Sequence, residues 1–198
     1  MSKVYKIGII GTKNVGKTTL ATQLTEALAH KGFRATIVRE VAQDCPLPIN
    51  KDTTIESGYW LFGTQIAREA ISECDSPIVI CDRTVLDVIP FVRLSYEAFS
   101  LGRQDSASEI GMLERLIQDY VDAQPYDQIF YLPKNEAFWQ STLSRDEIEF
   151  RRSLDREFRT YLHEAGVSHH EVTGKSTSRQ LAEILDTVLS PISAKCSS

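Results

Sequence analysis

The stretch that decides the fold is KVYKIGIIGTKNVGKTTLATQLTEALAH, residues 3–30. It starts with Tyr5 to Ile10, a short run rich in isoleucine that predicts a buried strand. The segment GTKNVGKT at 11–18 follows directly and matches the pattern G-x-x-x-x-G-K-[ST]. Lys17 to His30 then repeats leucine at a spacing of four, as one face of an amphipathic helix does. A strand, a glycine-rich turn and a helix in this order predict a loop that binds phosphate groups.

Each position of this loop has a chemical reason. Gly11 and Gly16 let the backbone turn tightly, so that successive N–H groups point at a polyphosphate. Lys17 is expected to reach the β- and γ-phosphates, and the Thr18 hydroxyl to coordinate Mg²⁺. The expected nucleotide-binding residues in this loop are Gly11, Thr12, Lys13, Asn14, Val15, Gly16, Lys17, Thr18 and Thr19.

Beyond the loop, short β-branched runs alternate with longer segments of helical period, a pattern typical of a parallel sheet covered on both faces. We therefore predict an α/β protein with a three-layer fold, a five-stranded parallel sheet flanked by helices, and one domain over residues 1–198. The remaining strands are expected at Arg34 to Val38, Pro77 to Cys81, Gln128 to Leu132 and His169 to Val172. The remaining helices are expected at Ser57 to Glu73, Ser108 to Ala123, Asp146 to Glu164 and Ser178 to Leu189.

Composition narrows the function further. The hydrophobic share of 42% and charged share of 25% over 198 residues are those of a folded globular domain. A net charge of -5 gives no basic field for nucleic acid, and no apolar run is long enough for a membrane helix. The four cysteines form no C-x-x-C pair, which favours a reduced, cytoplasmic protein without a zinc site. We expect neither a nucleic-acid nor a membrane partner, and a homodimer is compatible with the sequence.

Two expected strands end in an acidic and a basic residue side by side. Arg39 and Glu40 follow the second strand, and Asp82 and Arg83 follow the third. Ligands of open α/β sheets bind at the carboxyl ends of the strands, so these pairs are expected beside the phosphate loop. A carboxylate there could orient an acceptor hydroxyl and take its proton, while an arginine balances phosphate charge. The alternative is that both pairs are ordinary surface ion pairs.

The chain resembles the nucleoside and nucleotide kinases among phosphate-loop proteins, including deoxynucleoside kinases, thymidylate kinase and the ribosylnicotinamide kinase domain of bacterial NAD-regulator proteins. The resemblance spans most of the chain and rests on GTKNVGKT at 11–18, VRE at 38–40, VICDRT at 79–84 and YDQIFYLP at 126–133. Thymidylate kinase follows its Arg-Glu with Pro-Gly-Gly, whereas Val-Ala-Gln follows here, which argues against thymidylate as the acceptor.

The resemblance implies ATP and Mg²⁺ as cofactors and a small molecule as phosphoryl acceptor. It implies that Glu40 or Asp82 acts in catalysis, with Asp82 alternatively holding Mg²⁺ together with Thr18. It also implies an arginine-rich lid at about 140–157 and an approach of the backbone to adenine near Gly174. A solvated, salt-bridged helix face is the alternative for the lid. The expected catalytic residues are Lys17, Glu40, Asp82, Arg83, Arg151 and Arg152.

The acceptor is expected to meet the helix that contains Tyr59, Trp60, Phe62 and Gln65. Aromatic faces stack on flat rings, and Gln65 matches a glutamine at a similar place in deoxynucleoside kinases. An aromatic-rich helix can equally pack its rings into the core. Phe91 and Arg93 are weaker candidates for the pocket wall. The expected substrate-binding residues are Arg39, Glu40, Trp60, Gln65 and Arg83.

These observations predict a Mg²⁺-dependent small-molecule kinase that transfers the γ-phosphoryl group of ATP to a nucleoside or nucleotide-like acceptor. The alternative is a P-loop ATPase, AAA-like or otherwise, that acts as a regulatory or partner-binding module. No Asn-Lys-x-Asp guanine signature is present in the sequence, which disfavours a GTPase.

Overall fold

The glycine-rich loop follows the central strand of the sheet. In the computed structural model, which describes residues 4–99, 106–134 and 143–196, strand β1 (Tyr5–Gly11) is buried along its whole length. It pairs in parallel with β3 (Ile78–Asp82) on one side and β4 (Gln128–Leu132) on the other. The five strands have the order β2-β3-β1-β4-β5, with β2 (Ala35–Val38) and β5 (His170–Glu171) at the edges. This order confirms the predicted parallel sheet.

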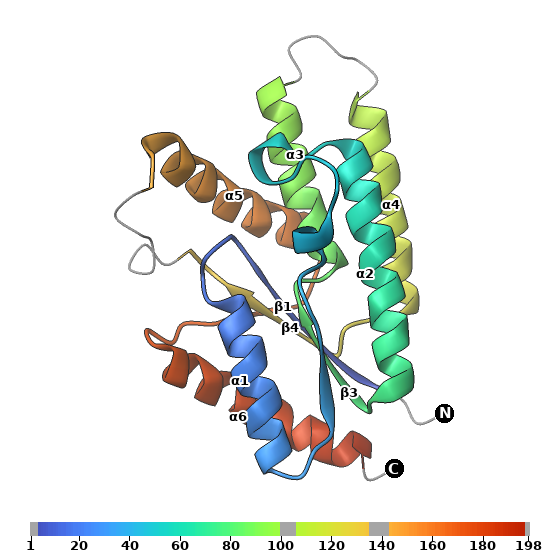
Figure 1. Ribbon diagram of the computed structural model, residues 1–198, viewed down its shortest axis with the longest axis vertical. Coiled ribbons are helices and arrows are strands. Elements are labelled where there is room, and N and C mark those ends of the chain that lie inside the picture. Colours follow the sequence, from blue (N-terminus) through green and yellow to red (C-terminus); the bar gives the residue numbers. More distant parts are fainter. Residues whose placement is uncertain (1–3, 100–105, 135–142, 197–198) are drawn as a thin grey trace.

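Helices cover both faces of the sheet, so the molecule has three layers (Figure 1). One face carries α1 (Lys17–His30) and α6 (Thr177–Cys196), which pack on the side chains of Ile7 and Ile9. The other face carries the remaining four described helices, which are α2 (Ile55–Asp75), α3 (Val88–Phe99), α4 (Ser106–Ala123) and α5 (Arg145–Glu164).

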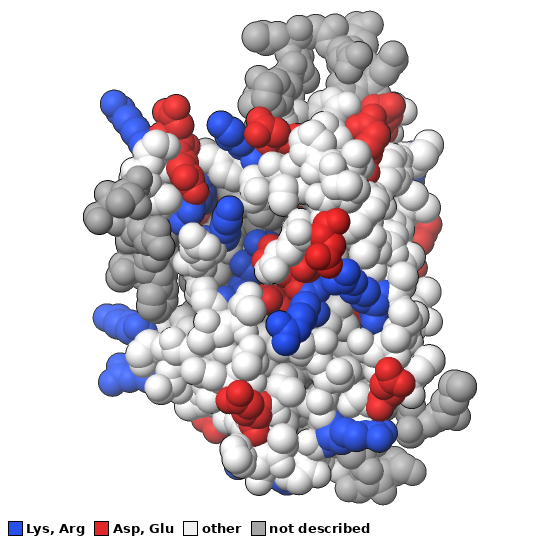
Figure 2. All heavy atoms as spheres, in the orientation of Figure 1, with Lys and Arg blue, Asp and Glu red and all other residues white. Residues whose placement is uncertain are grey.

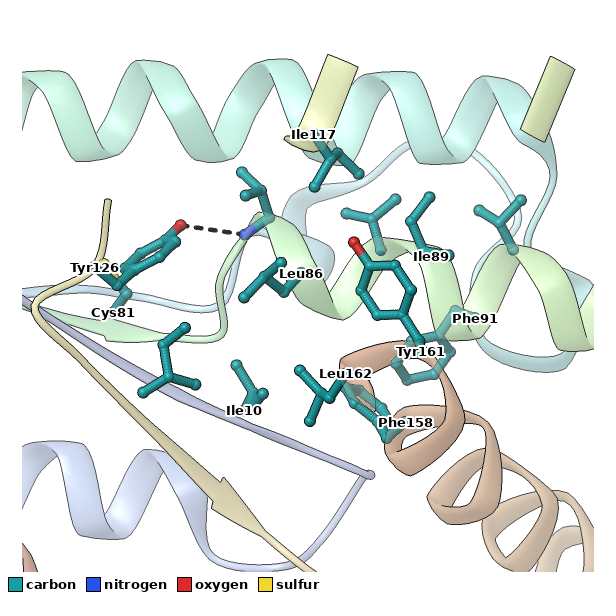
Figure 3. Packing of buried hydrophobic residues seen from close by; sticks show 14 of the residues in the cluster. Ile10, Cys81, Leu86, Ile89, Phe91, Ile117, Tyr126, Phe158, Tyr161 and Leu162 are labelled. Carbon is teal, nitrogen blue, oxygen red and sulfur yellow. Dashed lines mark hydrogen bonds between the residues drawn. The ribbon is translucent and has the colours of Figure 1, made fainter. Parts of the chain in front are cut away.

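The two layers of helices enclose two hydrophobic cores. The larger core gathers apolar side chains from β3, α3, α4 and α5, among them Cys81, Ile89 and Phe158 (Figure 3). Inside it, the Tyr126 hydroxyl accepts a hydrogen bond from the backbone N–H of Val85 at 3.3 Å. Because Leu154 and Phe158 belong to this core, the second half of α5 is fixed to the body of the protein.

Helix α3 is the element that the sequence did not predict. Residues 84–92 are buried without interruption, so the run has no polar face and therefore no helical period to detect. Pro90 lies in the first turn of α3, where the missing N–H costs no helical hydrogen bond. The irregular segment between β2 and α2 contains two 3₁₀ helices, Val41–Asp44 and Asn50–Asp52. None of the helices within the described residues combines the length and apolarity that a membrane crossing needs.

Candidate nucleotide and acceptor site

The glycine-rich loop has the backbone geometry of an anion cradle. Gly11 and Gly16 have φ values of 138° and 95°, in a region that disfavours any side chain, and Asn14 has φ 59°. Nothing lies within 4 Å of the position that a Cβ on Gly16 would take, so it is conformation and not space that requires glycine there. Helix α1 begins at Lys17, and its amino terminus therefore faces the loop.

Lys17 lies inside this loop and is almost completely buried. Its Nζ donates a hydrogen bond to the backbone oxygen of Thr12 at 2.5 Å. Burial, and then the neighbouring charge of Arg83, lowers the pKa of Lys17 to about 7. A polyphosphate in the loop would place negative charge next to Lys17 and stabilise its protonated form. The lysine is therefore suited to an anionic ligand.

Thr18 and Asp82 meet at the carboxyl end of β3. The Thr18 hydroxyl donates to Asp82 Oδ2 at 2.5 Å, while Asp82 Oδ1 is buried and has no hydrogen-bond partner among the described residues. Burial raises the pKa of Asp82, although the Thr18 hydrogen bond and the Lys17 charge oppose that rise. A hydroxyl and a carboxylate with a spare oxygen fit Mg²⁺, which binds through one or two protein oxygens together with phosphate and water. The described residues contain no cluster of three or more His, Cys, Asp or Glu that could hold a metal unaided.

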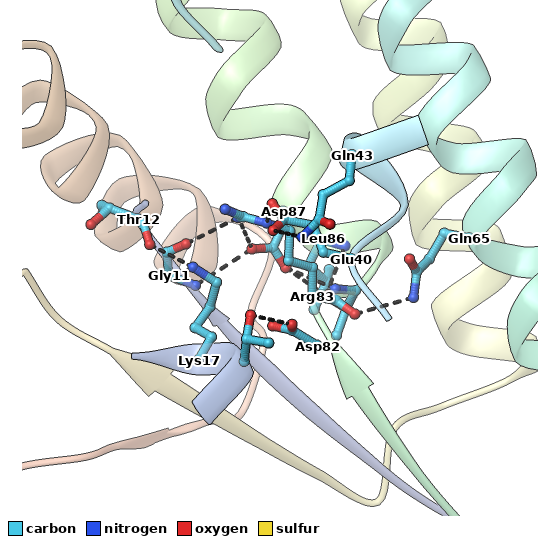
Figure 4. Close-up of polar contacts among 12 residues, drawn as sticks. Gly11, Thr12, Lys17, Glu40, Gln43, Gln65, Asp82, Arg83, Leu86 and Asp87 are labelled. Atoms are coloured by element: carbon cyan, nitrogen blue, oxygen red, sulfur yellow. Dashed lines mark hydrogen bonds and ion pairs between the residues drawn. The ribbon is translucent and has the colours of Figure 1, made fainter. Parts of the chain in front are cut away.

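Arg83 is the centre of the charged network beside the loop (Figure 4). It has φ 79°, unusual for a residue with a side chain, and its backbone N–H donates to Ile9 O at 3.0 Å. Its guanidinium forms ion pairs with Glu40 and with Asp87, the latter at 3.0 Å. Burial, the largest single influence, would raise the pKa of Glu40, but the charge and hydrogen bond of Arg83 together with the charge of Lys17 hold that pKa below its usual value.

Asp87 is a residue of this network that the sequence analysis missed. It is buried, and its Oδ1 accepts from Arg83 and, at 3.4 Å, from the backbone N–H of Gly11. Its Oδ2 accepts from the backbone N–H of Thr84 at 2.8 Å. Burial raises the pKa of Asp87. Asp87 pairs with Arg83 four residues earlier, but Arg83 directly follows β3 with φ 79° and lies outside any helix, so helical spacing did not predict this contact.

A cavity of about 560 Å³ opens over the loop. It is lined by residues 13–19 together with Glu40 and Arg83, which are among the predicted site residues, and also by Thr177 and Gln180 at the start of α6. Gly174, predicted to approach adenine, packs against α6 instead of lining this cavity, and its backbone N–H donates to Glu183 at 3.1 Å. Thr177 and Gln180 are thus the residues of this region that line the cavity, and the approach of Gly174 to adenine stays a prediction.

A second, largely apolar cavity lies on the other side of Glu40. Its walls include Leu61, Gln65 and Phe91, and Glu40 and Arg83 line both cavities. It holds only about 40 Å³, whereas sites for drug-sized ligands measure about 300–1,000 Å³. An acceptor of nucleoside size must therefore widen it. Ile49 and Asn50 separate it from the first cavity and from a third one of about 350 Å³, since they line all three.

The other predicted residues differ in whether they line a cavity. Arg151 is buried and lines the third cavity together with Lys13, whereas Arg152 is half-buried and does not line it. Trp60 is half-buried beside Leu61 but does not line the second cavity, and Arg39 is exposed. Figure 2 shows both basic and acidic side chains around a hollow near the middle of the molecular face.

Two further aromatic and basic candidates have structural contacts. Phe62 forms an edge-to-face contact with Tyr120 of α4, with ring centroids 6.1 Å apart. Arg93 forms ion pairs with Glu114 of α4 and with Glu157 and Glu164 of α5. Phe91 lines the second cavity as predicted, with the Arg83 guanidinium 5.4 Å from the centre of its ring. Arg93 therefore joins three helices instead of completing the pocket wall.

The parallel sheet, the loop and the residues at the strand ends define a phosphate-loop protein with the fold of nucleoside and nucleotide kinases. Within that class, the sequence family described as an AAA domain matches residues 6–179, and the chain belongs to that family. No curated protein matches the sequence closely enough to count as a relative.

Solved structures of other proteins, two of them kinases, have the same fold. A NadR protein in complex with NAD and AMP-PNP superposes with a TM-score of 0.68 at 17% identity, over 94% of this chain and 48% of that one. This chain thus spans about half the length of the NadR protein. Deoxyadenosine kinase from M. mycoides with bound dCTP gives a TM-score of 0.67 at 15% identity, over 93% and 99% of the two chains. Thymidylate kinase from Ehrlichia chaffeensis gives 0.61 at 18% identity, over 94% and 99%.

Proposed function

We propose that this protein transfers the γ-phosphoryl group of ATP to a hydroxyl group of a nucleoside or a nucleotide-like molecule. The observation that carries the proposal is the position of Glu40, which lines both the cavity over the phosphate loop and the apolar cavity beside it. A carboxylate at that junction can meet an acceptor hydroxyl on one side and the terminal phosphate on the other. The deoxyadenosine kinase and thymidylate kinase structures of the same fold support this assignment.

The two candidate carboxylates then have separate roles. Glu40 orients the acceptor hydroxyl and takes its proton as the new P–O bond forms. Asp82 is directed at Thr18, away from the acceptor side, and together they would hold Mg²⁺. When bound, Mg²⁺ would neutralise charge on the phosphates.

The basic residues hold the phosphates. Lys17 lies on the loop side of the cavity and would bind the phosphate that is transferred. Arg83 holds Glu40 in place through their ion pair. Arg151, which lines the third cavity together with Lys13, is the better placed of the two predicted lid arginines to approach the nucleotide. Charge stabilisation by such fixed groups is the main source of catalysis in phosphoryl transfer.

The decisive experiment measures ADP formation from ATP and Mg²⁺ with panels of nucleosides, nucleotides and vitamins. A true acceptor should accelerate ADP formation and raise the melting temperature of the protein. The product should carry the labelled phosphate from [γ-³²P]ATP, and Lys17→Met should abolish the label. ADP formation that no acceptor accelerates would contradict the kinase proposal.

Two observations favour a second candidate function. The AAA-domain family match and the closed acceptor cavity of about 40 Å³ both suit a P-loop ATPase that acts on a partner protein. In that case ATP hydrolysis would proceed without a small acceptor and would change when the partner binds.

A further inference from the structure

A buried carboxylate on α2 is bonded to hydrogen-bond donors on all sides. Glu69 is fully buried, and its Oε2 accepts from Lys6 Nζ at 3.0 Å and from the Tyr120 hydroxyl at 2.9 Å. Its Oε1 accepts from the Tyr126 hydroxyl at 2.7 Å and from Gln65 Nε2 at 2.8 Å. A carboxylate with an ammonium partner and three further donors remains an acceptor only.

This carboxylate determines which way the Gln65 amide faces. Gln65 Nε2 donates to Glu69 and also to the backbone oxygen of Arg83 at 3.1 Å. Both partners offer only lone pairs, so the NH₂ group must face them and the amide cannot be reversed. Both N–H bonds of the amide are thereby used.

The remaining polar atom of the amide is its oxygen. Gln65 lines the apolar cavity beside Glu40, and its Oε1 is buried without a hydrogen-bond donor from the described part of the chain. A buried acceptor left without a donor destabilises the protein, and a ligand that donates a hydrogen bond to it would remove that cost.

Resting on the proposed function, we propose that Glu69 is a positioning residue that fixes Gln65 as a hydrogen-bond acceptor, so that the acceptor cavity selects molecules with an N–H donor on their ring. The substrate class is therefore a nucleoside whose base carries such a donor at the edge that meets α2. The glutamine does not read both faces of an amide-like edge, because its own donors are occupied by the protein.

The test compares nucleosides that differ mainly in this donor. Adenosine is compared with purine riboside, and cytidine with its 4-deoxy analogue, using the full chain with Mg²⁺ and ATP and measuring kcat and KM for each. The amino-bearing member of at least one pair should have a KM lower by about tenfold or more, because the unpaired oxygen discriminates against the other.

Two variants test the role of Glu69. Glu69→Gln keeps the shape but adds an amide that can donate to Gln65, so the preference should fall to about threefold or less, with kcat changed less than KM. Glu73→Gln is the matched control, because Glu73 also pairs with Lys6, at 3.1 Å, whereas the Gln65 amide donates to Glu69 and to Arg83 and not to Glu73. It should keep the full preference.

A measurement on the ligand-free protein tests the amide orientation directly. In the full chain labelled with ¹⁵N-glutamine, the side-chain NH₂ signals that Gln65→Leu removes should exchange slowly with solvent, since both protons are bonded and buried. Rapid exchange of both would overturn the inference, whatever the substrate.

The outcomes separate this inference from the proposed function. Phosphorylation of both members of each pair with equal KM would overturn the donor requirement and leave the kinase assignment intact. A stable Glu69→Gln protein with the full preference would overturn the role of Glu69. Absence of transfer to any acceptor would overturn the proposed function, and the substrate class inferred here with it.

Discussion

Two groups of buried charges lie at opposite ends of β1, and they differ in how completely their hydrogen bonds are made. At the amino end, Glu69 receives four donors, one of them Lys6, the second residue of the strand. At the carboxyl end, Asp82 Oδ1 and Thr12 Oγ1 are buried without partners in the described residues, and Lys17 has a lowered pKa.

This difference distinguishes a buried charge that supports the fold from one that serves a ligand. A carboxylate whose hydrogen bonds are all made within the protein has no bonding capacity left for a ligand, and its substitution lowers the stability of the fold. An unsatisfied one has spare bonding capacity that a metal ion or a phosphate can use. The following predictions measure that difference, from the largest expected effect to the smallest.

Lys17→Met should lower phosphoryl transfer by about 10³-fold or more, because the transferred phosphate loses its nearest buried cation. The melting temperature should not fall, since a buried ammonium group with a lowered pKa is replaced by an apolar side chain. Kinetic assays and thermal unfolding check both parts. Substantial residual transfer would remove Lys17 from the mechanism.

Glu69→Ala should lower the free energy of unfolding by about 3–5 kcal/mol, because Lys6 and two tyrosine hydroxyls lose a buried partner. Urea denaturation measures the loss. Glu73→Ala is the control, and it should cost about 1 kcal/mol or less, since Glu73 is partly exposed and Lys6 keeps Glu69. Equal losses in the two variants would show that the network is not centred on Glu69.

Glu40→Gln should lower kcat by about 10²-fold or more while the KM for ATP changes by less than about threefold, since the amide cannot take the acceptor proton. Steady-state kinetics with the acceptor found in the screen check this. Wild-type turnover in this variant would transfer the role of base to Asp82 or to Asp87.

Asp82→Asn should leave the ligand-free protein as stable as the wild type or more stable, by about 1 kcal/mol. Because the pKa of Asp82 is raised, the folded state binds a proton more tightly than the unfolded state. Ionisation of Asp82 therefore lowers the free energy of unfolding as pH rises from the unfolded-state pKa to the folded-state pKa. Thermal unfolding at pH 7 measures the gain. The additional stabilisation that Mg²⁺ gives to the ADP complex should be lost, and its retention would argue against Asp82 as a metal ligand.

ADP binding should take up about one proton at pH 8 and much less at pH 6, because phosphate raises the pKa of Lys17 from about 7 in the free protein. Calorimetry in two buffers with different ionisation enthalpies measures the uptake. Subtraction of the Lys17→Met result isolates the lysine from the titration of ADP itself. If the proton uptake assigned to Lys17 were the same at pH 6 and pH 8, the lowered pKa of Lys17 would be contradicted.

The sequence was sufficient for the sheet and the loop because their signals are local. A glycine-rich loop directly after a buried strand is read within eight residues, and the strand ends at Glu40 and Asp82 follow from the rule for parallel sheets. Both residues do lie beside the loop, because Glu40 forms an ion pair with Arg83 and Asp82 accepts a hydrogen bond from Thr18.

The residues that the sequence did not indicate depend on contacts between distant segments. Asp87 enters the site through its contacts with Gly11 and Arg83, and Gln180 lines the nucleotide cavity from α6. Helical phase separates Trp60 from Leu61 and Arg152 from Arg151, and a shift of one position decides which side chain faces a cavity. Of the lid predicted at about 140–157, residues 140–142 lie outside the described residues, and the part from residue 145 onward belongs to α5.

The small volume of the cavity beyond Glu40 has a consequence for how much ATP is hydrolysed when no acceptor is bound. About 40 Å³ leaves room for very little solvent behind Ile49 and Asn50, so a nucleotide that binds alone meets few molecules able to attack it from that side. For the proposed kinase, the small size of this cavity thus limits hydrolysis of ATP by water, until an acceptor that fits displaces Ile49 and Asn50.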